Sequence, residues 1–568
     1  MAQNKKEMDE QENQALKQRV RLLLDEVKAG RVYFSTQVPQ TAESIKKVRL
    51  NSDGSVDLNT VDGLVRAAAL AASYVKTQRE LKEIPLRKTQ EGYFALLEQL
   101  FSKPYSEMLK HQINPHQIAS DMANRKNIVE AMAHDTDELH RTVLEFWEAA
   151  APVIEAHLSS LNRLRGVYGG DIFPSYQQNI AIETGLYLDT VVVPDPLLRV
   201  LSLRSTFRPE RYTYLLVKHA LSALRYKTLA LAEVDPPIVV VAPDFFHLEE
   251  SVRKFITFQG EQDLLFHAER LFGMKFGTEA DLTKFLGTIR SKKQLAQLVK
   301  EPDRFLLDVE WQHLPIPERI EKHREMMGEN LGEKIRLSDF SMEFRLMFGG
   351  RMMQISDAVF KAGRLGGTVL MDAPTSWRYL AWKYQDQHLI TQKVDPSASP
   401  DFIANALAVS GSDIMVISNL PEKDLIALRK EGALGELREL MSKGINEIQQ
   451  ASEHDFKKIA EQISSNMAAA LASHSQELKT FMGGTKKFFG VKVAPFIGYA
   501  SLALAAAASG NVGLSVLAAG LGLVGLPSAK DVSSKAMELL KERKKLVRSP
   551  VGMLFRASQK AGTTRSSL

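Results

Sequence analysis

The chain contains no cysteine among its 568 residues. Disulfide bonds, thiolate metal sites and cysteine nucleophiles are therefore excluded, and so is a disulfide-stapled extracellular domain. The first twelve residues are polar and charged, and they lack the apolar core and small-residue cleavage site of a secretory signal. Together these absences predict a cytoplasmic protein.

Nucleotide-binding and hydrolase signatures are also missing. No Gly-x-x-x-x-Gly-Lys-Ser/Thr loop occurs, no Gly-x-Gly-x-x-Gly follows a candidate strand, and no Gly-x-Ser-x-Gly elbow is present. ATP or dinucleotide use and Ser/His/Asp catalysis are not indicated, so we expect no cofactor.

The composition is that of a globular protein, with 44% hydrophobic and 25% charged residues. A chain of this length exceeds the size of a single core, so several folded units are expected. Composition shifts and Gly/Pro clusters predict five parts: an N-terminal amphipathic arm and loop (1–58), a helical domain (59–165), a mixed α/β domain (166–420), a helical connector (421–485), and an apolar hairpin with a basic tail (486–568).

The middle of the chain carries short β-branched runs bounded by breakers, at Gly185–Pro196, Ile238–Asp244, Thr368–Pro374 and Ile414–Pro421. Their near-continuous apolarity predicts strands covered on both faces. Elsewhere the apolar spacing is helical, as in Leu16, Val20, Leu23 and Val27, whose stripe we expect to lie on its own domain. The predicted fold is mainly α, with helical bundles around an irregular α/β or α+β middle.

The strongest signal is a run of 37 uncharged residues between Lys492 and Lys530. Ser509-Gly510-Asn511 divides it into Val493–Ala508 and Val512–Leu526, and each half is shorter than the roughly 20 apolar residues that span a bilayer. Small residues nevertheless recur at helix-contact spacing, and cations flank the run. These features favour an apolar helical hairpin that either engages membrane or packs inside the protein.

The basic charge is concentrated behind this run. Residues 530–568 hold ten Lys/Arg against three Asp/Glu, so their net charge is +7 and the rest of the chain carries −2. Such a tail attracts anionic headgroups. The predicted membrane-binding residues are Phe496, Ile497, Leu502, Leu504, Leu514, Leu517, Leu521 and Leu523 for insertion, with Lys486, Lys487, Lys492, Lys541, Arg543, Lys544, Lys545 and Arg548 for headgroups.

Carboxylates at the ends of the candidate strands indicate a different chemistry. Converging aspartates could hold Mg²⁺ for phosphodiester hydrolysis, and the alternative catalytic set is Asp189, Asp195, Asp244 and Asp372, with Asp413 also at a strand end. The run Tyr187–Thr190 resembles the opening strand of PIN-type nucleases, but the resemblance covers four residues and lacks the Asn that usually follows. The purely structural interpretation is that these aspartates are turn or cap residues.

Three further clusters have ordinary structural explanations. His134, Asp137, Glu138 and His140 share one helix. A metal site in a helical bundle needs ligands from other helices as well, so a solvated face is favoured and no metal is expected. The Met/Phe-rich segment Phe340–Phe360 fits core packing better than an adaptable partner groove. Trp377, Arg378, Trp382 and Lys383 lack a broader basic surface, so nucleic-acid binding is not supported.

These features predict a cytoplasmic, non-enzymatic effector that binds a protein partner through its body and engages anionic membrane at the inner face through its hairpin. Homo-oligomerisation and a role in toxin-like or antiviral defence fit this layout by analogy. One alternative is a metal-dependent nuclease or hydrolase, and another is a soluble helical scaffold with a buried hairpin.

Overall fold

The computed structural model describes residues 2–32, 39–161, 164–170, 179–330, 340–394, 415–418, 420–432, 435–450, short pieces of 458–470, and 492–495. Within them the fold is mainly helical with a small parallel sheet in the second compact unit, which confirms the predicted fold class. The predicted hairpin after Pro495 lies outside the described residues, as do the insertion residues and the cations from Lys541 onward. Lys486 and Lys487 lie outside them too.

Contacts divide the chain into two compact units, the first ending at Leu86 and the second beginning at Arg87. The first unit contains α1 (Ala2–Lys28), α2 (Pro39–Lys46), a short 3₁₀ turn and α3 (Gly63–Lys82). Val20 and Leu23 of α1 are fully buried in a cluster with residues of α2 and α3. The apolar stripe of α1 therefore packs within its own unit, as predicted, whereas α2 was not foreseen in a segment expected to be loop.

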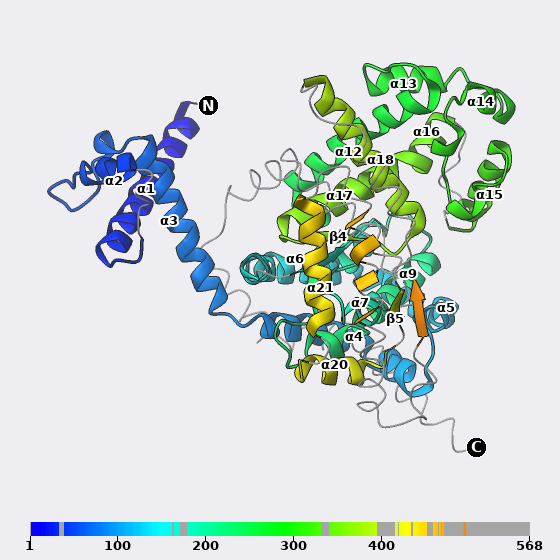
Figure 1. The fold of residues 1–568 in the computed structure, drawn as a ribbon, viewed down its shortest axis with the longest axis horizontal. Coiled ribbons are helices and arrows are strands. Elements are labelled where there is room, and N and C mark those ends of the chain that lie inside the picture. The colour runs from blue at the N-terminus through cyan, green and yellow to red at the C-terminus, as the bar shows by residue number, and fades with distance from the viewer. Residues whose placement is uncertain are drawn as a thin grey trace. The chain divides into compact units, whose positions relative to one another are not determined.

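The second unit is built of helices around the sheet, and Figure 1 shows the sheet inside this helical shell. Long helices confirm the helical pattern predicted before residue 165. The structure also has helices after residue 421, and their apolar positions Leu425, Leu428, Leu437 and Met441 are buried. The main helices of the second unit are α4 (Leu86–His111), α5 (Pro115–Ala123), α6 (Lys126–Ser160), α7 (Ile180–Thr184), α8 (Leu197–Ser202), α9 (Pro209–Leu224), α10 (Lys227–Ala230), α11 (Phe245–Leu248), α12 (Glu250–Phe272), α13 (Glu279–Leu286), α14 (Lys292–Leu298), α15 (Ile316–Asn330), α16 (Phe340–Phe344), α17 (Gly350–Arg364), α18 (Pro374–Val394), α20 (Glu422–Lys430) and α21 (Gly435–Gln450).

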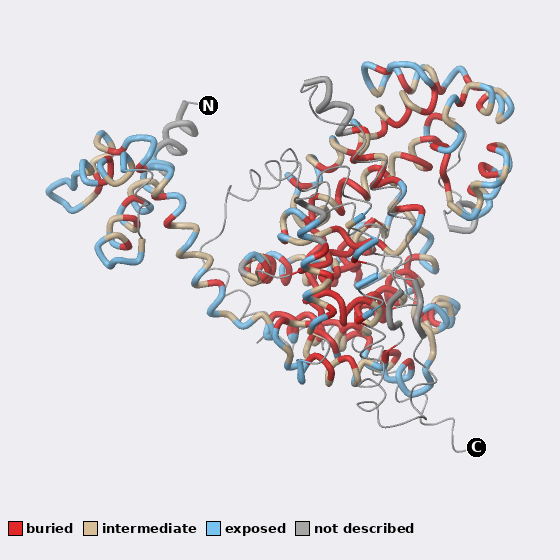
Figure 2. Tube along the Cα trace, in the orientation of Figure 1, coloured by how far each residue is buried: buried red, intermediate tan, exposed pale blue. Residues whose placement is uncertain are grey.

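Four parallel strands form the sheet in the order β3-β2-β1-β4. They are β1 (Arg165–Tyr168), β2 (Thr190–Pro194), β3 (Val239–Ala242) and β4 (Thr368–Leu370). Almost every residue of these strands is buried, so they are the red centre of Figure 2. Coverage on both faces explains why their sequences read as continuous apolar runs rather than alternating ones.

β1 is not among the strands predicted from the sequence. Its Gly166 is typical of a strand breaker but is a packing residue here, because a Cβ on Gly166 would come within 2.6 Å of Leu188 and 3.1 Å of Leu370. The segment pairs with β2 on one side and β4 on the other. β1 is therefore an internal strand of the sheet.

The four strands predicted from β-branched runs are confirmed, including β5 (Met415–Ser418). β5 pairs antiparallel with β6 (Lys492–Pro495), in a two-stranded sheet. Because Val493–Pro495 are in a strand, the first three residues of the expected helix Val493–Ala508 are wrongly assigned. A β-branched residue at Val493 and a proline at Pro495 suit the edge of a short strand.

The free edge of β3 is covered by a side chain. Gln90 of α4 accepts a hydrogen bond from the Val241 amide at 2.8 Å and donates to the Val241 carbonyl at 2.9 Å. The side-chain amide of Gln90 therefore takes the place of a neighbouring strand, and both backbone groups of Val241 are paired.

Replacing Gln90 with leucine is expected to lower the free energy of unfolding by about 2 kcal/mol, because two buried backbone groups lose their partners. Urea denaturation measures the change. Lys88→Ala, which alters an exposed residue of the same helix, is the matched control. An equal effect of the two substitutions would remove the proposed role of Gln90.

Candidate functional site

The carboxyl edge of the parallel sheet is the natural place to look for a site. In open α/β sheets, ligands bind outside the carboxyl ends of the strands, where the strand order reverses. Here the reversal lies between β1 and β4. Asp195 directly follows β2, and Asp244 and Asp372 come two positions after the ends of β3 and β4, so three of the four predicted aspartates lie at the carboxyl edge of the sheet.

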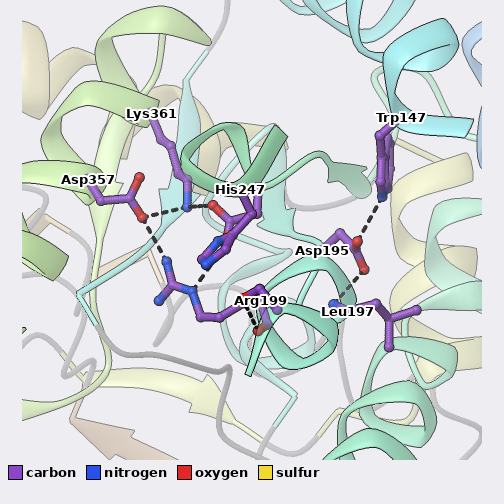
Figure 3. Close-up of polar contacts among 9 residues, drawn as sticks. Trp147, Asp195, Leu197, Arg199, His247, Asp357 and Lys361 are labelled. Carbon is purple, nitrogen blue, oxygen red and sulfur yellow. Dashed lines mark hydrogen bonds and ion pairs between the residues drawn. The ribbon is translucent and has the colours of Figure 1, made fainter. Parts of the chain in front are cut away.

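Asp195 is buried, and its hydrogen-bond donors are uncharged. Its Oδ1 accepts a hydrogen bond from the Tyr93 hydroxyl at 2.7 Å. Its Oδ1 also accepts one from the Leu197 amide at 3.1 Å, and its Oδ2 accepts one from the Trp147 indole at 2.7 Å (Figure 3). Burial raises the pKa of Asp195 to about 6, against the effect of these donors. The carboxyl group links α4 and α6 to the end of β2.

Asp244 is the centre of a cluster of charges, which we call the carboxyl-edge cluster and which comprises Arg199, Asp244, His247, Asp357 and Lys361. Asp244 contacts the Lys361 ammonium at 2.8 Å, the Arg199 guanidinium at 3.2 Å and the His247 ring at 3.0 Å. Asp357 accepts hydrogen bonds from the same two cations, at 2.6 Å and 3.2 Å. Figure 3 shows Asp357 bonded to both Lys361 and Arg199.

The charges in this cluster compensate one another. Burial acts to raise the pKa of Asp244, but Lys361 and Arg199 together outweigh it and hold that pKa well below its usual value. Burial acts to lower the pKa of Arg199, and Asp244 and Asp357 reverse this, so the guanidinium pKa is raised. The cluster is therefore a buried network of ion pairs that keeps Asp244 ionised and Arg199 protonated.

Helix α17 supplies two of the five residues of this cluster because it lies close against the end of β1. A Cβ on Gly169 would come within 2.5 Å of the Ala358 Cβ, so only glycine permits this approach. Asp357 and Lys361 are one helical turn apart and face Arg199 and Asp244. Side chains of the protein itself thus fill much of the space where α/β proteins hold ligands.

Asp372 lies at the strand reversal and belongs to a separate group. The Tyr168 hydroxyl donates to its Oδ1 at 2.8 Å. Burial, with Asp372 as the second cause, raises the pKa of Glu183 on α7. Ser376 of α18 donates to the Gly170 carbonyl, which ties the segments after β1 and β4 together.

Asp189 does not join the other aspartates, since it precedes β2 and lies at the amino edge of the sheet. It accepts a hydrogen bond from the Leu164 amide at 3.0 Å and is 3.6 Å from the Arg438 guanidinium. The run Tyr187–Thr190 therefore leads into β2 rather than ending a strand with an exposed carboxylate. Asp413 lies outside the described residues.

The remaining sequence candidates are held by local contacts. Asp137 pairs with Arg204 at 2.5 Å, and burial, then His247, lowers the pKa of His140. Lys383 is bound to Asp263, and Trp382 packs against His267 and Tyr379 instead of forming a base-stacking platform with Trp377.

The Met/Phe segment is packed as predicted. Phe344, Met347, Phe348, Met352 and Ile355 are buried in the core. Met342 is 52% exposed and is the exception.

Arg199, Asp357 and Lys361 were not identified from the sequence. The available signal was the pair Asp357 and Lys361 at i, i+4 within an otherwise apolar stretch of α17, since paired charges are the usual form in which ionised residues enter a core. Arg199 carries no comparable signal. Only the fold brings it to α17, from 158 positions earlier in the chain.

Within the described part of the chain, no group of three or more His, Asp or Glu residues is placed to hold a metal ion. None of the helices described there has the length and hydropathy to cross a bilayer. No family model, curated protein or solved structure matches this chain.

Replacing Asp195 with asparagine is expected to change the pH dependence of stability. The carboxyl pKa is about 6 in the folded protein and near 4 when unfolded, so the folded state binds the proton more tightly. The stability contributed by this group is therefore present below pH 4 and is lost as pH rises to 6, a change of about 3 kcal/mol. Urea denaturation at several pH values between 4 and 7 should show wild type losing this amount relative to Asp195→Asn, whereas parallel curves would contradict the assignment.

Proposed function

We propose that this protein is a non-enzymatic effector whose body binds a partner and whose C-terminal segment engages anionic membrane. The observation that carries the proposal is the run of 37 uncharged residues between Lys492 and Lys530, with Lys486 and Lys487 before it and a tail of net charge +7 from Lys530 onward. An uncharged segment bracketed by cations matches the layered chemistry of a bilayer with acidic headgroups. By analogy, such an effector suits a toxin-like or antiviral defence system.

The contacts of the aspartates at the carboxyl edge of the sheet support this proposal. At the carboxyl edge, Asp195 and Asp244 are already bonded to donors or cations of the protein. Carboxylates engaged in this way act as structural links and are poorly placed to bind Mg²⁺. The body is thus better suited to recognition than to carboxylate-metal catalysis.

The proposal predicts that full-length protein floats with vesicles of phosphatidylcholine and phosphatidylserine in a density gradient. The double variant Leu504→Asp/Leu517→Asp should lose binding by about a hundredfold or more, because each aspartate costs about 3 kcal/mol in a hydrocarbon environment. Leu64→Asp, at a residue 42% exposed on α3, is the matched control. Equal flotation of all three proteins would reject the proposal, and failure of the wild type to float would favour the scaffold with a buried hairpin.

The alternative of a metal-dependent nuclease or hydrolase is favoured by one observation, the shared edge of Asp195, Asp244 and Asp372. Its test is Mg²⁺-dependent cleavage of DNA and RNA by the full-length protein. Asp372→Asn is the informative variant, because Asp372 is less buried than the other two. If the wild type cleaves nucleic acid and Asp372→Asn does not, the nuclease would replace the effector proposal. Flotation with vesicles would then report membrane binding that is separate from the catalytic activity.

A further inference from the structure

The second unit contains a cavity away from the carboxyl edge. Its volume is about 340 Å³, within the range of small-molecule sites. It opens between the end of α4, the turn into α5, the start of α10 and the start of α20. The lining residues used below are Tyr105, Met108, Leu109, Ile113, Pro115, Arg225 and Glu422.

One side of the cavity is apolar. Met108 is buried, whereas Leu109 next to it is 58% exposed, and Ile113 and Pro115 continue the wall. An exposed leucine beside a concave apolar surface gains free energy when a ligand covers it. This wall suits an aliphatic or thioether group of a few carbon atoms.

The other side carries one charge of each sign. Glu422, the first residue of α20, is partly buried, and burial raises its pKa, while a hydrogen bond with Thr228 and the charge of Arg225 oppose that shift. Burial, with Glu422 as the second cause, raises the pKa of Tyr105 to about 12. Glu422 is therefore within electrostatic reach of both Tyr105 and Arg225, and all three residues line the cavity.

The turn that forms the rim is held in a conformation unusual for its sequence. Gln112 has a φ of +52°, which is uncommon for a residue with a Cβ. The Ile113 amide donates to the Met108 carbonyl at 3.0 Å, and Asn114 caps α5 in a capping box with Gln117. The left-handed residue directly after α4 and the bond from Ile113 back to Met108 are the usual C-cap of a helix, and together with the capping box they fix the shape of the turn.

We propose that this cavity binds a small zwitterion with an apolar side chain, the class of free hydrophobic α-amino acids. The ligand ammonium would pair with Glu422 and its carboxylate with Arg225, so that charges of opposite sign alternate around the site. A guanidinium has five N–H donors, which allows Arg225 to contact Glu422 and a ligand carboxylate together. The side chain would lie on Met108, Leu109 and Ile113.

Isothermal titration calorimetry of the full-length protein tests this with L-leucine, L-methionine and L-phenylalanine. Two analogues of leucine each lack one charge: isopentylamine has no carboxylate, and 4-methylpentanoate has no ammonium. We expect saturable binding of at least one amino acid, weakened about tenfold or more when either charge is absent. Glu422→Gln should weaken the amino acid by a similar factor, and Glu431→Gln, at an exposed residue at the end of the same helix, should not.

A second variant tests the apolar wall independently of the charges. Leu109→Ala should weaken leucine binding several-fold and leave glycine binding unchanged, because glycine has no side chain to cover the wall. Absence of saturable binding for all amino acids would overturn the proposal. Binding that is equally strong for the single-charge analogues, or unaffected by Glu422→Gln, would also overturn it.

Discussion

Replacing Lys361 with methionine is expected to lower the free energy of unfolding by about 3–5 kcal/mol, the range for breaking a buried ion pair. The ammonium lies 2.8 Å from Asp244 and 2.6 Å from Asp357, so its loss leaves two buried carboxylates with Arg199 as their remaining full cation. Methionine keeps most of the side-chain volume, so the effect reports charge rather than a cavity. Urea denaturation at pH 7 gives the magnitude.

Two features distinguish this effect from ordinary loss of packing. The penalty should shrink as pH falls from 7 towards 4, because carboxylates without their cation have raised pKa values and can be protonated. Adding Asp357→Asn to Lys361→Met should restore about 1 kcal/mol or more, since one uncompensated charge is removed. Lys254→Met, which removes an ammonium 76% exposed in a surface pair, should change stability by less than about 0.5 kcal/mol. A penalty independent of pH, with no rescue by Asp357→Asn, would contradict the ion-pair account.

Replacing Arg429 with methionine is expected to lower the free energy of unfolding by roughly 4 kcal/mol. Its guanidinium donates to the carbonyls of Gly185, Leu188, Asp189 and Pro236, at 2.8, 3.1, 2.9 and 3.0 Å. These carbonyls belong to the segments leading into β2 and β3, so one side chain of α20 satisfies the backbone at the amino edge of the sheet. Each buried carbonyl that loses its donor costs about 1–3 kcal/mol, partly recovered by relaxation.

The loss of stability caused by Arg429→Met should be confined to the amino edge of the sheet. Hydrogen exchange monitored by mass spectrometry should show loss of protection in α20 and around Gly185–Asp189 before global unfolding, because those segments share the guanidinium. Lys430→Met, at an exposed neighbour on the same helix, is the control and should leave both segments protected. Uniform loss of protection throughout the unit, or no loss, would argue against a local anchor.

The carboxyl-edge cluster illustrates what the sequence could and could not show. Asp244 was identified because it closely follows the apolar run Ile238–Ala242, and a carboxylate after a buried strand is a local pattern. Its partners were not, because Arg199 and Lys361 lie 45 and 117 positions away and only helix packing brings them together. Metal binding, the alternative role considered for it, required other carboxylates nearby, whereas the fold places Lys361 and Arg199 beside it.

The sequence by itself determined the mainly helical class, the strands β2 to β5 and the amphipathic stripe of α1, because periodicity and β-branched runs act within a few residues. The tertiary structure decided the place of β1, whose four residues carry little apolar signal and are buried only because β2 and β4 flank them. It also decided that Asp189 and Asp195 lie at opposite edges, and that Glu422 and Arg225 line one cavity together with apolar residues of α4. Strand order and the pairing of buried charges depend on crossovers that join distant segments, and no local pattern of residues contains that information.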